Sequence, residues 1–130
     1  MARITVVNDN PEFLELMHDI LEDDRYEATT IDGDQPDAVE RIVASRPDLL
    51  MIDLRVGRDE LHGWGVAQEV RRDGRFHRLP ILVCSADVMV LRTIQDELAE
   101  HHSVRALTKP FSIDDLTGAI DALLSDGVPA

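Results

Sequence analysis

Four polar side chains that follow apolar segments could carry phosphate and metal chemistry in this 130-residue chain. Of its 13 lysine and arginine residues only Lys109 is a lysine, and it comes directly after an apolar stretch. Asp53 closes a second apolar run, and the pair Asn8 and Asp9 follows a third. If the three runs are parallel strands of one sheet, their carboxyl ends share an edge. The sequence then predicts a cleft that holds two carboxylates and a cation.

The residue types in this cleft indicate phosphoryl chemistry assisted by a divalent ion. Two carboxylates a few ångströms apart repel each other, so Asp9 and Asp53 predict a seat for Mg²⁺, with Mn²⁺ as the alternative. Asp53 is the candidate nucleophile, because a carboxylate oxygen can attack a phosphoryl group whose charge is neutralised. Lys109 would bridge to Asp53 before transfer and to a phosphoryl oxygen afterwards. Ser85, which ends another apolar run, would donate its hydroxyl to a further phosphoryl oxygen.

The apolar pattern that must position these residues predicts five strands alternating with five helices. The expected strands are residues 3–8, 26–31, 49–53, 80–85 and 104–108. Because parallel strands need crossover helices on both faces, we expect an α/β fold with a doubly wound, five-stranded parallel sheet. The flavodoxin-like order 2-1-3-4-5 is favoured, since it places the ends of the first and third strands side by side.

Two local expectations concern the segments next to the cleft. Helical spacing predicts one buried stripe on the first helix. The residues of this stripe are Phe13, Leu16, Met17, Ile20 and Leu21. After Asp53, a loop is expected to precede the third helix. This loop would contain Gly57, Gly63 and Gly65.

Composition limits the classes of partner and compartment. The formal net charge of −13 disfavours direct binding to nucleic acid or to an anionic membrane. The single Cys84 lies within an apolar run and is interpreted as a buried core thiol, which favours a cytoplasmic location. No apolar segment approaches the ~20 residues that span a bilayer, and the start of the chain lacks the layout of a signal peptide. We expect one domain over residues 1–125, followed by a tail at 126–130.

The chain resembles the receiver domain of two-component response regulators. The resemblance rests on four segments in register, at residues 6–11, 48–54, 83–86 and 107–111. It implies that Asp53 accepts a phosphoryl group from the phosphohistidine of a histidine kinase or phosphotransfer protein, with Mg²⁺ required. Ser85 and Lys109 would contact the acyl phosphate.

The resemblance also supplies expectations about the metal and the partners. The expected metal set is Asn8, Asp9, Asp53 and Arg55. The face formed by the fourth helix, fifth strand and fifth helix would report the state of the domain to a downstream protein. Chemistry would be limited to phosphorylation and dephosphorylation of the domain itself. The exposed face of the fourth helix is a candidate homodimer surface.

Three features depart from the usual pattern of that family. Asn8 stands where the first of two acids is usual, which predicts weaker metal binding. Ala106 stands where an aromatic switch residue is usual, so signal transmission is expected to differ. The loop after Asp53 is longer by about two residues and lacks a proline, which predicts altered access to the cleft. We also expect Arg55 and Asp87 to pair across its mouth and to slow dephosphorylation.

These departures keep a second hypothesis open, namely a receiver-like module that binds its partner without phosphorylation. A phosphatase or phosphomutase with an aspartyl nucleophile fits less well, because Arg55 occupies the position where such enzymes usually carry a second acid. A flavin carrier also fits poorly. The loop after the first strand lacks the hydroxyls and glycines that would cradle a phosphate.

Overall fold

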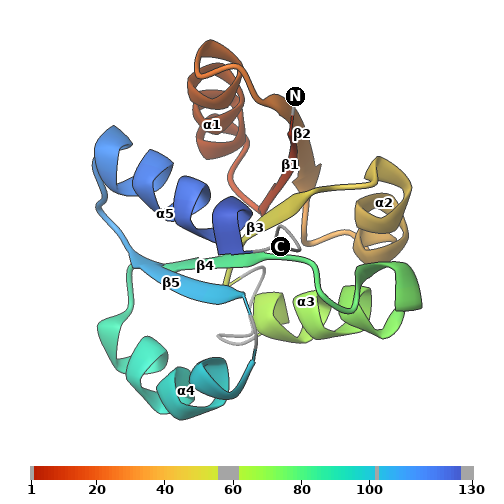
Figure 1. Ribbon diagram of the computed structural model, residues 1–130, viewed down its shortest axis with the longest axis vertical. Helices are drawn as coiled ribbons and strands as arrows, with labels where there is room; N and C mark the ends of the chain where they lie inside the picture. The colour runs from red at the N-terminus through yellow and green to blue at the C-terminus, as the bar shows by residue number, and fades with distance from the viewer. Residues whose placement is uncertain (1, 56–61, 102, 127–130) are drawn as a thin grey trace.

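The computed structural model describes residues 2–55, 62–101 and 103–126. Its centre is a five-stranded parallel sheet of order β2-β1-β3-β4-β5 (Figure 1). The strands are β1 Arg3–Asn8, β2 Glu27–Asp32, β3 Leu49–Asp53, β4 Ile81–Ser85 and β5 Val104–Thr108. The predicted fold class and strand order are confirmed.

Helices cover both faces of the sheet. They are α1 Pro11–Asp23, α2 Ala38–Ser45, α3 His62–Arg72, α4 Val88–Glu100 and α5 Ile113–Asp126, with a short 3₁₀ turn, η1, at Gly74–Phe76. Helices α1 and α5 pack on one face, and α2, α3 and α4 pack on the other (Figure 1). The central strands β3 and β4 are buried on both faces, as expected for parallel strands between two helix layers.

Side-chain caps fix where the helices next to the cleft begin. Asn10 Oδ1 accepts hydrogen bonds from the backbone N–H groups of Glu12 (2.9 Å) and Phe13 (3.3 Å), so α1 begins directly after β1. At α5 the Asp115 N–H donates to Ser112 Oγ (2.9 Å), and the Ser112 N–H donates to Asp115 Oδ2 (3.2 Å). Each cap satisfies backbone donors that the first helical turn leaves unpaired.

The predicted buried stripe of α1 is partly wrong. Met17 and Leu21 are buried and Phe13 and Ile20 are partly buried, but Leu16 is 54% exposed. Leu16 is one residue from Met17, which is about 100° of rotation around the helix. It therefore falls outside the stripe that faces the sheet.

The predicted loop before the third helix is also partly wrong. Gly63 and Gly65 lie within α3, which begins at His62, whereas Gly57 lies outside the described residues. At the other end of the chain, the expected boundary between domain and tail falls in the last turn of α5, which runs to Asp126.

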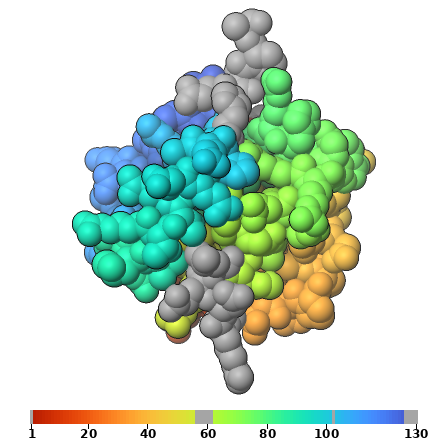
Figure 2. Space-filling model, turned by 90° about the horizontal axis from the view of Figure 1, so that it is seen from below, coloured from red at the N-terminus to blue at the C-terminus, as the bar shows by residue number. Residues whose placement is uncertain are grey.

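A buried tryptophan links α3 to α4. Trp64 is 3% exposed, and its Nε1–H donates to Glu97 Oε1 of α4 at 2.9 Å. Gln68 Nε2 donates to the same oxygen at 3.3 Å. The ring of His101 lies edge-on to the indole, with 5.1 Å between the ring centroids. Figure 2 shows α3 and α4 side by side on one surface of the molecule. The first turn of α3, beside the cleft, is thereby tied to α4.

Tyr26 provides a test of how α5 packs, because its hydroxyl donates to Asp121 Oδ1 at 2.8 Å. Burial, followed by this bond, raises the pKa of Tyr26 from 10.0 to about 12. Since folding favours the neutral phenol, the stability it contributes is fully present below pH 10 and is lost as the pH rises to about 12. We expect this sole tyrosine to ionise near pH 12 by ultraviolet absorbance, and Asp121→Ala to lower the midpoint. An ordinary midpoint in the wild-type protein would contradict the contact.

The sheet brings the predicted polar residues to one edge. Asn8, Asp53 and Ser85 are the last residues of β1, β3 and β4, and Lys109 directly follows β5. In the register of the sheet, Asp53 pairs with Cys84 and Ser85 pairs with Thr108. In the described ranges, no helix has the length and apolar character needed to cross a membrane.

Candidate functional site

The Asp53 carboxylate is the centre of the candidate site. Its side chain is 11% exposed and accepts hydrogen bonds from residues at the ends of β1 and β5 and from the backbone that follows β3. Oδ2 receives Lys109 Nζ and, at 3.2 Å, Asn8 Nδ2, while Oδ1 receives the backbone N–H of Arg55 at 2.9 Å. A carboxylate held by three donors is oriented in one direction, which suits a nucleophile.

Lys109 is the positive charge of this site. Its ammonium forms an ion pair with Asp53, and its backbone N–H donates to the Ser85 carbonyl at 2.8 Å. The same ammonium lies 4.3 Å from the centroid of the Phe13 ring. Both the backbone and the ammonium of Lys109 are therefore held in place.

A small cavity adjoins the Asp53 and Lys109 pair. It has a volume of about 160 Å³ and is lined by Asp53, Arg55, Ser85, Ala86, Asp87, Val90 and Lys109. A volume of this size has room for a small tetrahedral anion together with water. Within it, a carboxylate, an ammonium and a hydroxyl face the same space.

Ser85 is 3% exposed, and its hydroxyl is positioned by the turn that follows β4. Its Oγ accepts the Asp87 N–H at 3.0 Å. Asp87 Oδ1 in turn accepts the N–H groups of Met89 (3.0 Å) and Val90 (3.2 Å), so Asp87, not Ser85, caps α4. The serine proton has only a long contact, 3.5 Å, to the Asp87 carbonyl. It can therefore turn toward a ligand in the cavity.

Asn8 ends β1 and Asp9 follows it at the same edge, but the two residues differ in their surroundings. Asn8 is 3% exposed; its Oδ1 accepts the Asn10 N–H at 2.8 Å, and its amide N–H₂ faces Asp53. Asp9 is exposed. No group of three or more His, Cys, Asp or Glu side chains that could hold a metal occurs among residues 2–55, 62–101 and 103–126. The two carboxylates of Asp9 and Asp53 are nevertheless hard oxygen donors, of the kind that Mg²⁺ binds with water completing its shell.

Comparison with known proteins agrees with this arrangement of residues. A family model described as "Response regulator receiver domain" matches residues 4–121. The chain belongs to the response regulator receiver family.

Similar proteins support this membership. Over 134 aligned residues the receiver is 33% identical to the DNA-binding dual master transcriptional regulator RpaA of Synechocystis, with 99% of this chain and 52% of that protein covered. The chain thus spans about half the length of that relative. Among solved structures, chemotaxis response regulator CheY4 of Vibrio cholerae has a TM-score of 0.79 at 21% identity, with 95% and 98% of the two chains covered.

A third similar protein was solved with metal. The receiver domain of sensor histidine kinase PA1611 from Pseudomonas aeruginosa, described with a magnesium ion in its active-site cleft, has a TM-score of 0.76 at 24% identity, with 95% and 98% of the two chains covered. At such identities, the likeness to these solved structures shows the fold of the receiver.

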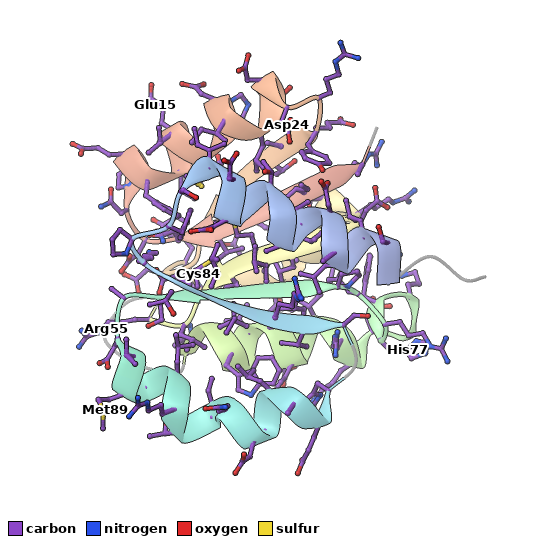
Figure 3. All side chains as sticks on the ribbon, turned by 60° about the vertical axis from the view of Figure 1, so that its left-hand side comes forward. Glu15, Asp24, Arg55, His77, Cys84 and Met89 are labelled. Carbon is purple, nitrogen blue, oxygen red and sulfur yellow. The ribbon has the colours of Figure 1, made fainter. Side chains whose placement is uncertain are left out.

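The predicted ion pair between Arg55 and Asp87 is not formed in this receiver. Both residues line the cavity, but no ion pair between them occurs in the described part of the chain. The Asp87 carboxylate is instead committed to capping α4. Figure 3 shows Arg55 at the end of the molecule where α4 begins, at the opposite end from His77.

Gly63 packs against the backbone at the end of β3, a role that the sequence did not reveal. Its N–H donates to the Leu54 carbonyl at 2.9 Å. A Cβ atom at this position would lie 1.8 Å from the Asp53 carbonyl oxygen. Only glycine therefore allows α3 to begin directly against the end of β3.

Cys84 lies next to the site but is not part of its chemistry. It is 1% exposed, as predicted, and Figure 3 shows it inside the molecule beside the sheet. Burial raises the pKa of its thiol to about 12, against the attraction of Lys109 and with the repulsion of Asp53 adding to the rise. The nucleophilic thiolate is therefore scarce at neutral pH.

Ala106 is exposed on the edge strand β5. It lines a cavity of about 400 Å³ whose other residues come from α4 and β5, including Leu91, Leu98 and Val104. The small side chain thus leaves a hollow between these two elements.

Proposed function

We propose that this receiver accepts a phosphoryl group on Asp53 from the phosphohistidine of a histidine kinase or phosphotransfer protein. The observation that carries the proposal is the ion pair of Asp53 with Lys109 at the wall of a cavity that the Ser85 hydroxyl also lines. Receivers are signalling domains, and the chemistry proposed here is confined to Asp53.

In the proposed reaction, an Asp53 carboxylate oxygen attacks phosphorus. The new O–P bond forms as the N–P bond of phosphohistidine breaks, and the imidazole nitrogen keeps the electron pair and takes up a proton. Lys109 moves its ammonium from the carboxylate oxygen to a phosphoryl oxygen, while Ser85 donates its hydroxyl to another. Both contacts stabilise charge that grows on the phosphoryl oxygens during transfer.

Asp9 and Asp53 would hold the divalent ion. Mg²⁺, or Mn²⁺ in its place, would neutralise negative charge on the phosphoryl group when bound. Of the other residues expected in the metal set, Asn8 has its amide oxygen engaged by Asn10, and the side chain of Arg55 is a cation, which leaves only its backbone carbonyl as a donor. We therefore propose the two carboxylates, completed by water, as the main ligands.

Metal binding to the folded protein should raise its melting temperature by mass action. We expect a rise on titration with Mg²⁺, repeated with Mn²⁺, and a much smaller rise in Asp9→Asn. Thermal unfolding followed by the fluorescence of the sole tryptophan, Trp64, measures both. A flat titration with either ion would show that the carboxylates do not form a metal site.

We propose that the receiver acts in the cytoplasm through protein contacts. Val88 and Met89 at the start of α4 are 48% and 66% exposed, and Ile113 at the start of α5 is 58% exposed. These apolar side chains suit the α4, β5 and α5 face to a downstream protein, or to a second copy of the chain. The net charge of −13 argues against direct contact of this domain with DNA.

Incubation with acetyl phosphate and Mg²⁺, followed by intact-mass measurement, tests the function. A single phosphoryl group is expected on the wild-type protein and none on Asp53→Asn. Absence of any adduct, with undiminished binding to a partner recovered by pull-down, would support the alternative of a phosphorylation-independent module. A parallel pull-down contains beryllofluoride, which mimics the acyl phosphate. A difference in partner binding between the two pull-downs shows that the partner distinguishes the phosphorylated state.

A further inference from the structure

We propose that Phe13 is a positioning residue for Lys109. Its ring, on the first turn of α1, holds the lysine ammonium against Asp53. The inference concerns the efficiency of the reaction assigned above and so rests on the proposed function.

The Lys109 ammonium contacts two partners. It forms an ion pair with the Asp53 carboxylate, and its Nζ lies 4.3 Å from the centroid of the Phe13 ring. A cation over an aromatic face is attracted by the negative charge of that face. The lysine side chain is only 24% exposed, so water competes weakly for the contact.

Phe13 is itself fixed by its neighbours. Its backbone N–H donates to the Asn10 cap, and its ring meets Phe111 edge-on, with 6.5 Å between centroids and 81° between planes. The Asn10 N–H donates to Asn8, whose amide donates to Asp53. The first turn of α1 is thus tied to the carboxylate by hydrogen bonds and to the ammonium by the ring, so it helps to position both side chains.

The same ring lines an apolar groove that shares Lys109 with the site cavity. The groove has a volume of about 550 Å³ and runs between α1 and α5. Its lining includes Phe13, Leu16, Phe111, Ile113 and Lys109. Leu16 also lines this groove and is 54% exposed, so it offers a matched control on the same helix.

Loss of the ring should free the lysine stem. Lysine carries a flexible four-carbon chain, and a leucine at position 13 would fill part of the space without attracting a cation. Lys109 would then leave Asp53 more often. We expect phosphorylation by acetyl phosphate to slow about two- to fivefold in Phe13→Leu, the effect of an exposed to partly buried cation–π contact.

Nuclear magnetic resonance tests the contact directly, because Lys109 is the only lysine of the chain. Protein carrying ¹³C-lysine, and no added lysine from a tag, gives a single ε-methylene signal. In the wild type its protons should be shifted upfield by the Phe13 ring, and Phe13→Leu should return them to the position of free lysine. Phe13→Trp should keep an upfield shift and restore the phosphorylation rate, and Leu16→Ala should change neither.

The outcomes separate this inference from the proposed function. A wild-type signal at the position of free lysine would overturn the role of Phe13. This measurement needs no variant, so it remains decisive even if Phe13→Leu does not fold. An unchanged signal in folded Phe13→Leu would also overturn it. If the wild type shows the ring shift but takes no phosphoryl group, the contact stands and the proposed function falls.

Discussion

Gly63→Ala is expected to destabilise this receiver by about 3 kcal/mol or more, the upper range for overpacking. The new Cβ would lie 1.8 Å from the Asp53 carbonyl oxygen, 2.8 Å from the Asp53 carbonyl carbon and 3.0 Å from the Leu54 carbonyl oxygen. All three are backbone atoms of the segment that carries the proposed acceptor. They cannot rotate away as the end of a side chain could, so α3 and the end of β3 must separate.

Urea unfolding of the variant and a matched control measures this effect. Gly65 lies two residues further along α3 and would have no atom within 4 Å of an added Cβ. Gly65→Ala should therefore be neutral or stabilise the helix by up to about 1 kcal/mol. Equal stability of Gly63→Ala and wild type would mean that α3 does not begin against Asp53 as described.

Lys109→Met is expected to slow phosphorylation of Asp53 by about 100-fold. Lysine supplies the ammonium that lines the cavity beside Asp53, and removal of one preorganised donor to transition-state charge costs about 10²–10³ in rate. Methionine keeps much of the volume and apolar stem but cannot pair with a phosphoryl oxygen. The initial rate of phosphoryl incorporation from acetyl phosphate at saturating Mg²⁺ is the measurement.

The control must remove one positive charge without touching the site. Arg92→Met does so, because Arg92 lies on α4 and lines the cavity beside β5 instead. Its rate should stay close to that of the wild type. Similar losses in both variants would assign the effect to net charge, and a normal rate in Lys109→Met would remove the lysine from the proposed mechanism.

Much of the fold can be predicted from the pattern of apolar residues within short segments of the sequence. The runs that lead to Asn8, Asp53 and Ser85 are mostly apolar because both faces of a parallel strand are buried. Strands of this kind require crossover helices, so the sheet and the convergence of its polar ends could be predicted without knowing any contact.

The side-chain contacts could not be predicted, because they depend on distances of a few ångströms between elements. The amide of Asn8 turns its N–H₂ toward Asp53 since its oxygen is taken by Asn10, and no sequence pattern encodes that choice. Asp87 caps α4 instead of pairing with Arg55. Phe13 was expected to be simply a core residue, whereas its ring also contacts the lysine.

The segment after Asp53 shows a different limit of sequence reasoning. Glycines usually indicate turns, and the sequence therefore predicts a loop at Gly63. In the structure Gly63 lies in the first turn of α3. Glycine is required there because the backbone of Asp53 and Leu54 lies too close for a Cβ atom, and not because of an unusual φ. Its proximity to Asp53 depends on how α3 packs against β3.

The chemical identity of the phosphorylated residue is the decisive measurement. Borohydride reduces the acyl phosphate of an aspartate to the alcohol, so treatment of the phosphorylated receiver followed by peptide mass spectrometry marks the acceptor. We expect homoserine at position 53 and unmodified aspartate at position 9. Homoserine at position 9, or no reduced aspartate in protein that has been incubated with acetyl phosphate and Mg²⁺, would contradict the assignment of Asp53 as the acceptor.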